Sequence, residues 1–457
     1  MRHFGWQWLA ASSLLLSLAA GAATRPQYGG TLRVAVREAP TSLDPADATQ
    51  ADSFARRNLM ALIFETLVTI DDRGRVHPAL AEAWETAPGD QRWQFRLRPG
   101  IRFHDGSPLT AELAASSLRA ANPSWNVMAE MDSVVIQCGA PDTNLPAELA
   151  QARNAIVKRN GSGKPSGTGP FHIEDWQPGK KLTLGAEESY WRGRAFLDSI
   201  EVELGKNYSS QLITLELGKA QLVEAAPEQT HRASMEGRRI DSSEPMELMA
   251  LVFSHDVQSP DKKLLRHALA LSVDRASIRS VLLQGAGQPA ASILPNWMSG
   301  YGFVFPADED LARARHERDQ VHALPTWSVG YDSNDPISQV LAERIALNAR
   351  DAGLTLQPTT SAATADVRVM RVPLASADPW VTLAQVAAIT GVDMPKTGGH
   401  SVEDLYAAEQ AVLATQRVIP LFHLPVSYAT SPALKDWLPD GVGDWRLGDV
   451  WLGSEKP

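Results

Sequence analysis

The chain has 457 residues, a formal net charge of −10 from 43 Lys and Arg against 53 Asp and Glu, and 44% hydrophobic residues. This length predicts two or more domains, and the apolar content argues against a disordered chain. The acidic balance argues against nucleic-acid binding, because a phosphate backbone needs an excess of cationic side chains. The single cysteine, Cys138, excludes an internal disulfide and a multi-cysteine metal site, and we expect it to be a small packed side chain.

The first 22 residues have the pattern of a cleaved secretory signal. Arg2 gives a positive start, residues 9–20 form an uncharged apolar run, and Ala20-Gly21-Ala22 offers the small residues of a cleavage site. The run is too short to span a bilayer comfortably, and no cysteine follows it to carry a lipid. We therefore expect an exported protein, most simply periplasmic, without a lipid anchor.

The next elements follow from hydrophobic spacing. Residues 31–37 alternate apolar and polar side chains and predict a strand, and residues 53–68 place apolar side chains at helical spacing. Residues 93–103 alternate on both sides of Pro99-Gly100, which predicts a β-hairpin. Thr110 is placed to cap a following helix.

Strands and helices then alternate through the rest of the chain. A Gly-, Ser- and Pro-rich loop is expected at 158–169, and the apolar run 248–253 predicts a buried strand or a crossing between lobes. Further strands are predicted at 171–173, 181–184, 200–204, 327–331, 354–356 and 367–372, and helices at 264–269, 274–285 and 337–345. The segment 327–356 has the order of a βαβ unit, so this part is expected to be α/β.

No catalytic motif is complete. Gly161-Ser162-Gly163-Lys164 lacks the spacing of a phosphate loop, and Gln320 stands where the second histidine of a zinc-protease motif starting at His316-Glu317 belongs. No G-x-S-x-G sequence occurs, and the histidines lack paired metal spacing. His104-Asp105 could suggest acid–base chemistry, but Asp-Gly is a common turn pair, and a structural turn is the favoured interpretation.

Several blocks in a fixed order resemble one family. Gly29-Gly30-Thr31-Leu32 and Ser42-Leu43-Asp44-Pro45 resemble the opening of the extracellular solute-binding proteins of the peptide/nickel class, family 5. The following blocks match later signatures of that family: residues 63–67, 78–84, 93–108, 167–171, 190–191 and 264–275. The resemblance is dense from Gly29 to Glu203, recognisable to about Gly287 and patchy beyond.

The resemblance implies an α/β fold of two lobes, of the periplasmic-binding-protein type (type II, cluster C-like), with a reduced extra subdomain in the first lobe. The expected division is a signal peptide at 1–22, a first lobe at 23–246 and a second lobe at 247–416. Residues 417–457 are expected to return to the first lobe. The subdomain is expected at about 46–165, shortened because residues 119–158 are few for the family.

The resemblance also suggests where a ligand binds. Peptide-binding members hold the ligand's ammonium with an Asp that precedes an Asp-Pro pair, and Ala375 stands at that position here. A buried ammonium without a carboxylate is unfavourable, so this departure weakens a free-peptide reading, although a three-residue shift would give the role to Asp378. The ligand-binding residues that the resemblance implies are Thr49, Ser254, Trp297, Tyr301, Asp378 and Trp380. For each tryptophan, ordinary core packing remains the leading alternative.

These features favour a periplasmic component of an ABC importer that captures a small solute, an oligopeptide or related compound, by hinge closure. The implied partners are the ligand and the permease subunits of the inner membrane, with a monomeric protein and with no cofactor and no metal. Two alternatives stay open: an exported hydrolase that uses an acid or base such as His104 in the cleft, and a periplasmic binding or sensor protein not coupled to transport.

Overall fold

The computed structural model describes residues 25–159, 165–255, 259–374, 376–395 and 399–453. The expected signal peptide, the Gly161–Lys164 segment and Ala375 lie outside these ranges. Within the described ranges, no helix has the length and apolar character needed to cross a bilayer.

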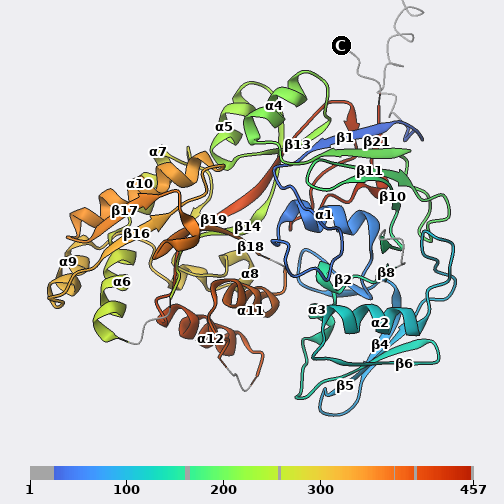
Figure 1. Ribbon diagram of the computed structural model, residues 1–457, viewed down its shortest axis with the longest axis horizontal. Helices are drawn as coiled ribbons and strands as arrows, with labels where there is room; N and C mark the ends of the chain where they lie inside the picture. The colour runs from blue at the N-terminus through green and yellow to red at the C-terminus, as the bar shows by residue number, and fades with distance from the viewer. Residues whose placement is uncertain (1–24, 160–164, 256–258, 375, 396–398, 454–457) are drawn as a thin grey trace, which may run out of the picture.

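One large sheet runs through the molecule and joins its two halves (Figure 1). Its strands follow the spatial order β10-β11-β12-β1-β13-β19-β14-β18-β16-β17, and β15 pairs at one side with β19. The bounds are β1 Thr31–Ala35, β10 Phe171–Gln177, β11 Lys181–Ala186, β12 Ser199–Glu203, β13 Leu222–Ala225, β14 Arg239–Phe253, β15 Gln288–Pro289, β16 Thr326–Gly330, β17 Thr355–Thr359, β18 Val367–Pro373 and β19 Val418–Thr430. We call the part around β1 and β10–β13 the first lobe, and the part around β16–β18 the second lobe.

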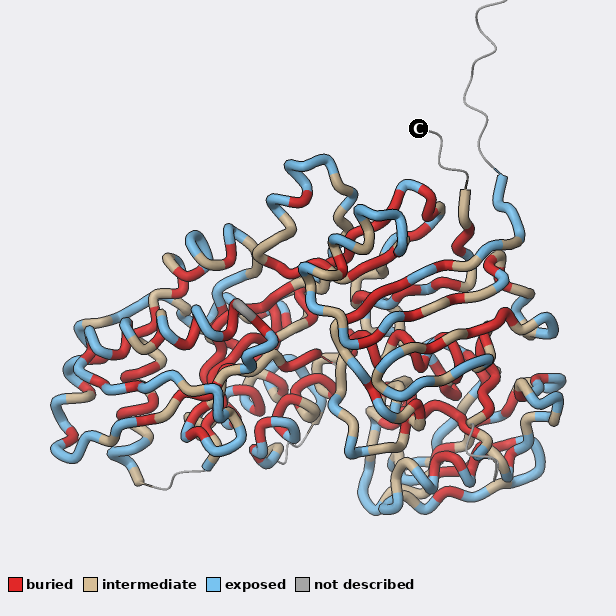
Figure 2. Tube along the Cα trace, turned by 45° about the horizontal axis from the view of Figure 1, so that its top comes forward, coloured by how far each residue is buried: buried red, intermediate tan, exposed pale blue. Residues whose placement is uncertain are grey.

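Two long antiparallel strands, β14 and β19, belong to both lobes. They pair from Arg239↔Thr430 in the first lobe to Val252↔Val418 in the second. Beyond the junction, alternate residues of β14 enter two different cores, with Leu251 and Phe253 on one face and Leu248 and Val252 on the other. The apolar run is continuous because helices cover both faces, so the predicted buried strand is also a lobe crossing. Figure 2 shows the buried track along these strands.

The first lobe is built on β1, which alternates as predicted. Leu32 and Val34 are buried in its core, whereas Arg33 between them is exposed. β1 pairs in parallel with both β12 and β13, and the C-terminal segment packs Trp437 and Trp445 into the same core. The other elements of this lobe are α1 Phe54–Ile63, α4 Tyr208–Glu216, α5 Pro227–Met235, β20 Leu434–Lys435, the 3₁₀ turn η4 Leu447–Asp449 and β21 Trp451–Leu452.

The second lobe contains the predicted βαβ unit. β16 and β17 pair in parallel from Thr326↔Thr355, and the helix between them packs Leu341 and Ile345 into the core beneath the sheet. Helices lie on both faces of the strands (Figure 1). They are α6 Pro260–Ser272, α7 Arg275–Val281, α8 Asn296–Ser299, η2 Gly302–Val304, α9 Leu311–Asp319, α10 Pro336–Asp351, η3 Ala362–Thr364, α11 Pro379–Thr390 and α12 Val402–Ala414.

A small subdomain with a core of its own lies next to the first lobe, at the lower right of Figure 1. A four-stranded sheet, in the order β4-β5-β7-β6, packs against α2, whose N-cap is Thr110 as predicted. Its elements are β2 Val68–Ile70, β3 Val76–Pro78, β4 Ala81–Thr86, β5 Arg92–Leu97, α2 Ala111–Ala121, β6 Asn126–Glu130, β7 Ser133–Gln137, α3 Leu145–Leu149, η1 Ala152–Asn154, β8 Lys158–Arg159 and β9 Pro165–Ser166.

The predicted hairpin across Pro99-Gly100 is wrong. β5 pairs instead with β4 and β7, and the segment after the turn makes only an isolated bridge between Arg102 and Pro108. Alternation correctly placed β5 on a buried face. It did not identify the partner strand, because β7 lies about 40 residues further along the chain.

The glycines of the Gly167-Thr168-Gly169 block serve close packing. A Cβ on Gly167 would lie 1.9 Å from the carbonyl oxygen of Ile63, and one on Gly169 would lie 2.6 Å from that of Leu62. Only glycine allows the chain to pass this close to the end of α1. The block thereby ties the subdomain loop to the first lobe.

Candidate functional site

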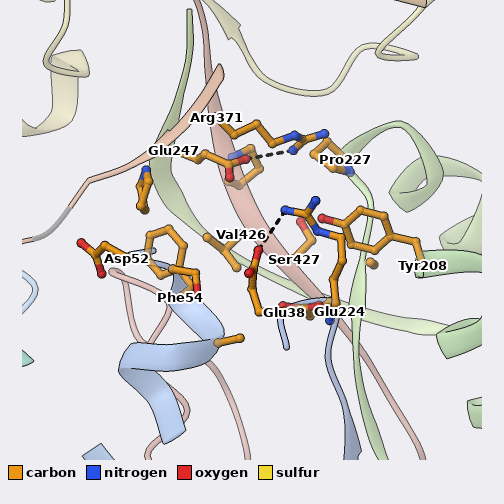
Figure 3. A pocket seen from close by; sticks show the side chains of 16 residues that line it. Glu38, Asp52, Phe54, Tyr208, Glu224, Pro227, Glu247, Arg371, Val426 and Ser427 are labelled. Atoms are coloured by element: carbon orange, nitrogen blue, oxygen red, sulfur yellow. Dashed lines mark hydrogen bonds and ion pairs between the residues drawn. The ribbon is translucent and has the colours of Figure 1, made fainter. Parts of the chain in front are cut away.

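A pocket lies at the junction of the two lobes, where β14, β18 and β19 meet the end of β1 and the start of α1 (Figure 3). Its volume is about 90 Å³, counted as the space that the centres of water molecules can occupy. The lining is rich in charge and comes from segments far apart in the sequence: Arg37, Glu38, Asp52, Ser53, Phe54, Ala55, Tyr208, Glu224, Ala225, Pro227, Glu247, Arg371, Pro373, Pro425, Val426 and Ser427. A concave site with a few convergent polar groups at a domain junction is where small ligands usually bind.

Arg371, on β18, forms part of the pocket wall and is 8% exposed. Its Nη1 donates to Glu247 Oε2 at 2.9 Å, and its Nε donates to Asp335 Oδ2 at 2.7 Å. Burial alone would lower the pKa of Arg371, but the carboxylates of Glu247 and Asp335 raise it well above its ordinary value. Its Nη2 has no hydrogen-bond partner among the described residues. The carboxylates of Glu247 and Asp335 therefore fix the guanidinium, and its Nη2 is left as a buried donor without an acceptor in the described part of the chain.

Arg37 follows β1 and presents the second cation of the pocket. Its guanidinium is paired with Glu38 at 3.4 Å and with Asp332 at 3.8 Å, and it lies 5.7 Å from the centre of the Tyr208 ring. Burial would lower the pKa of Arg37, but Tyr208 and Glu38 raise it above its ordinary value. Arg37 remains charged and lies over the ring of Tyr208.

Glu224 lies on β13, between the apolar residues Val223 and Ala225. Its carboxylate accepts hydrogen bonds from the backbone N–H of Arg37 at 2.5 Å and from Gln211 Nε2 at 3.1 Å. Burial raises the pKa of Glu224, because the charged form loses its hydration. Glu224 thus fixes the backbone at Arg37, which lines the pocket.

Contacts across the pocket hold the lobes together at the start of α1. Asp52 forms an ion pair with Arg57, with Nε at 2.8 Å from Oδ1, and it also accepts a hydrogen bond from Gln385 of α11. Arg57 Nη1 in turn donates to the carbonyl oxygen of Leu374 at 2.8 Å. Burial would raise the pKa of Asp52, but Arg57 lowers it below its ordinary value. These contacts join the start of α1 in the first lobe to Leu374 and Gln385 of the second lobe.

The subdomain also contacts the second lobe. Asn144 Nδ2 donates to Asp378 Oδ1 at 3.2 Å, and Thr143 Oγ1 lies 3.1 Å from His400 Nδ1. Asp378 Oδ1 at the same time accepts from the backbone N–H of Val381 at 2.9 Å and caps α11. Asp378 is thus a helix cap that also receives a contact from across the lobes.

The six residues implied by the family resemblance lie around the junction and beyond it, and none is among the described residues that line the pocket. Asp378 and Trp380 lie at the start of α11, where the Trp380 ring is 4.9 Å from that of His400. Trp297 Nε1 donates to the carbonyl oxygen of Pro245 on β14 at 3.0 Å. These three stay close to the lobe boundary.

The remaining three also lie outside the pocket lining. Thr49 is exposed and its Oγ1 bonds to Asp47 Oδ1 at 2.6 Å, as in a surface turn. Ser254 donates to the carbonyl oxygen of Ala365 at 2.5 Å and lies seven positions beyond Glu247, roughly 20 Å along an extended chain. Tyr301 is buried, and burial together with the nearby Glu409 raises its pKa. Their ligand roles stay predictions.

His104 and Asp105, on which the hydrolase alternative depends, both have hydrogen-bond partners within the protein. His104 Nε2 lies 3.0 Å from the carbonyl oxygen of Gly169, and burial lowers the pKa of His104. Asp105 accepts from the backbone N–H of Ser107 at 3.0 Å and pairs with Lys158 at 2.5 Å. This pattern is that of a turn. Across the described part of the chain, no three His, Cys, Asp or Glu side chains are grouped as a metal site needs.

Sequence reasoning missed the charged pocket residues, although one signal pointed to them. Arg371 and Glu224 each interrupt a buried apolar strand, where an unpaired charge is unfavourable. A charge in such a position needs a partner or a ligand. The partners could not be read from the sequence, because Glu247 and Asp335 come from other elements.

The profile of the bacterial extracellular solute-binding proteins, family 5 middle, matches residues 75–378. The chain is 26% identical over 244 residues to the nickel-binding protein NikA of Staphylococcus aureus, an alignment that covers 50% of this chain and 49% of that protein. It is 24% identical over 331 residues to the probable D,D-dipeptide-binding periplasmic protein DdpA of Escherichia coli, covering 65% of this chain and 64% of that one. The alignments thus span less than two thirds of the length of these curated relatives.

Solved structures share the fold over nearly the whole chain. The periplasmic binding protein DppA of Helicobacter pylori, in complex with the peptide STSA, superposes with a TM-score of 0.79 at 19% identity, over 94% of this chain and 99% of that one. The binding protein AgaA of A. tumefaciens R10, in complex with agropinic acid, gives a TM-score of 0.78 at 18% identity, over 93% and 99%. At this identity the likeness establishes the two-lobed mixed α/β fold.

Proposed function

Because the chain belongs to the bacterial extracellular solute-binding proteins, family 5, we propose that it is the substrate-binding component of an ABC importer. It captures a small solute between its lobes and delivers it, chemically unchanged, to a membrane permease. The observation that carries this proposal is the charged pocket at the lobe junction, bridged by contacts between the lobes.

The crossing strands supply the mechanical part of this function. β14 and β19 run from one lobe into the other, so a small change of backbone angles at the junction would rotate the lobes as rigid bodies. The hydrogen bond from Arg57 to the carbonyl oxygen of Leu374 and the one from Asn144 to Asp378 form only when the lobes approach. A ligand that contacts both walls stabilises the closed form by its differential affinity for that form.

The domain boundaries are part of the proposal. We assign residues 23–246 and 417–457 to the first lobe, with the subdomain at about 46–165, and residues 247–416 to the second. Separate buried cores support the two lobes and a subdomain, but the subdomain's own core begins only at Leu67, because the residues of α1 pack into the core of the first lobe. The proposed location is the periplasm, after removal of a signal peptide and without a lipid anchor, and the proposed partners are the permease subunits. The protein is expected to act as a monomer.

An enzymatic role has less support. A hydrolase needs a nucleophile or an activated water near a poised acid or base. His104 and Asp105 are engaged in a turn of the subdomain and do not line the pocket. A binding role without transport remains compatible with the same pocket, and it differs only in whether a permease accepts the cargo.

Native mass spectrometry of the purified protein tests the proposal together with small-angle scattering. We expect a bound small molecule, and we expect the ligand-free protein to become more compact when that molecule is returned. A Kd of about 1 µM corresponds to about −8 kcal/mol, which gives a clear thermal shift at saturating ligand. The absence of a bound solute, of stabilisation by any solute class and of any change in compactness would contradict the proposal. Conversion of a bound solute, lost in His104→Ala, would revive the hydrolase.

A further inference from the structure

The pocket presents cations and carboxylates on different walls, and we propose that its occupant is a compact zwitterion of single-amino-acid size. Its carboxylate would bind the free donor of Arg371, and its cationic group would face the acids near Glu38 and the start of α1. This inference rests on the proposed function and specifies the class of ligand.

The anionic end is assigned from the unused donor of Arg371. The guanidinium is more than nine-tenths buried, and Glu247 and Asp335 fix its orientation through Nη1 and Nε. Nη2 finds no acceptor among the described residues. A buried N–H of a charged group calls for an acceptor, and a ligand carboxylate provides one with matching planar geometry. Pro373 and Pro227 line the pocket beside it but offer no N–H that could compete for the carboxylate.

The cationic end is assigned from the balance of charge in the wall. Four carboxylates line the pocket, those of Glu38, Asp52, Glu224 and Glu247, against the two guanidinium groups of Arg37 and Arg371.

Pairing inside the protein leaves an excess of negative charge near the arginines. Arg371 is shared between Glu247 and Asp335, and Arg37 is shared between Glu38 and Asp332. A ligand with a carboxylate alone would add to this excess. A ligand that also carries an ammonium group would offset it, which is the complementarity expected of a specific site.

The size limit comes from the cavity itself. A water molecule needs a cavity of at least about 10–15 Å³ and fills about 30 Å³ in the liquid, so the pocket volume of about 90 Å³ corresponds to only a few water-sized groups. This is the size of a single amino acid or a close analogue. An extended oligopeptide would require the contacts of Arg57 with Leu374 and of Asp52 with Gln385 to open.

Calorimetry and thermal shift on the purified, dialysed protein test the inference with defined probes. The probes are the twenty standard amino acids, a nonapeptide of alanine and, for the best binder, two analogues that each lack one charge: its amide and its deaminated acid. We expect at least one amino acid to bind, both analogues to bind at least tenfold more weakly, and the nonapeptide to give no shift.

Two variants separate recognition from folding. Arg371→Lys keeps a cation beside Glu247 and Asp335 but withdraws the planar Nη2 donor, and we expect an affinity loss of at least tenfold. Glu38→Gln, at a partly exposed position, should narrow the preference for the amino acid over its deaminated acid. Arg232→Lys, on the exposed face of α5, is the matched control and should change neither value.

Each outcome supports or overturns the assignment of a compact zwitterion. A nonapeptide or a single-charge analogue that binds as well as the amino acid overturns the inference, and so does full affinity in Arg371→Lys. If no amino acid binds, the solute found by native mass spectrometry decides: another compact zwitterion supports the inference. A solute lacking either charge overturns it while leaving the proposed function intact. If no solute is found and the lobes never close, the inference and the proposed function fail together.

Discussion

Two buried arginines of the second lobe illustrate the difference between a structural site and a binding site. Arg275 begins α7, is 4% exposed and donates to backbone carbonyls, with Nη2 at 2.9 Å from the oxygen of Pro420 and Nη1 at 3.1 Å from that of Ala270. Burial lowers the pKa of Arg275 to about 10. The side chain of Arg371 is 8% exposed, but carboxylates surround it and raise its pKa.

The two regions differ in whether the guanidinium has a nitrogen without a hydrogen-bond partner. Arg275 joins α6, α7 and β19 into one core and has no buried nitrogen without a partner among the described residues. Arg371 is held by Glu247 and Asp335 and lines the pocket, yet its buried Nη2 has no hydrogen-bond partner among the described residues. A saturated arginine stabilises the fold, whereas a fixed arginine with a spare donor is poised to bind. Measuring stability and affinity separately tests this contrast.

Arg275→Ala is the change with the largest expected effect. It leaves the carbonyls of Pro420 and Ala270 without their donor and creates a cavity, so the free energy of unfolding should fall by about 3–5 kcal/mol. Urea unfolding followed by tryptophan fluorescence measures this loss. The fraction that remains folded should bind ligand with unchanged affinity. A large affinity loss at unchanged stability would reverse the roles of the two arginines.

His423 on β19 extends the contrast to a titratable group in a saturated position. Burial lowers the pKa of His423 to about 4, and its Nε2 lies 3.0 Å from the carbonyl oxygen of Ile293. The unfolded chain binds a proton near pH 6.5, whereas the folded chain does so only near pH 4. The stability from the neutral ring is therefore fully present above pH 6.5 and falls by about 3 kcal/mol as the pH drops to 4.

Urea titrations at pH 7 and pH 4 check this window. His423→Gln retains a donor for the carbonyl oxygen of Ile293 and cannot be protonated, so its loss of stability between the two pH values should be smaller by about that amount. His77→Gln, at an exposed position of β3, is the control. An equal acid sensitivity in the wild type and in His423→Gln would show that this ring does not govern the loss.

Arg371→Lys should have the opposite profile to Arg275→Ala. The lysine ammonium keeps a charge next to Glu247 and Asp335, so the free energy of unfolding of the ligand-free protein should change by no more than about 1.5 kcal/mol. Ligand affinity should nevertheless fall at least tenfold, or about 1.4 kcal/mol. Chemical unfolding and calorimetry on the same preparation give both numbers. A stability loss as large as that of Arg275→Ala would make Arg371 a structural residue.

The most regular elements of the fold could be predicted from local pattern, whereas the two-lobed arrangement was implied by the family resemblance. The alternation of Leu32, Val34 and Val36 identified β1, and the apolar run from Leu248 to Phe253 identified the crossing strand. These signals are strong because burial on one or both faces leaves a periodic trace in the sequence. The hairpin at Pro99-Gly100 failed because pairing between strands distant in sequence leaves no such trace.

The pocket was harder to predict for a related reason. Its charged residues, from Arg37 to Ser427, come together only through the sheet order, and each alone resembles a surface charge. Family resemblance identified segments near the junction, such as Asp378, but not the charged residues that line the pocket. Arg371 was visible as a charge within a buried strand, yet its spare donor depends on where Glu247 and Asp335 lie in space.

The smallest expected effect concerns the contact between the subdomain and the second lobe. Asn144→Ala removes the 3.2 Å hydrogen bond to Asp378 but leaves the cap from Asp378 to Val381 N–H in place. The closed form should lose about 0.5–1.5 kcal/mol relative to the open form, with little change in unfolding. Fluorescence energy transfer between labels on the two lobes should then require more ligand for closure. Asn122→Ala breaks a comparable bond to Asn154 inside the subdomain and should leave closure unchanged. If both variants raise the ligand concentration needed for closure equally, the subdomain acts through its own stability. In that case the contact between Asn144 and Asp378 does not couple the lobes, and Arg371 and its neighbours do.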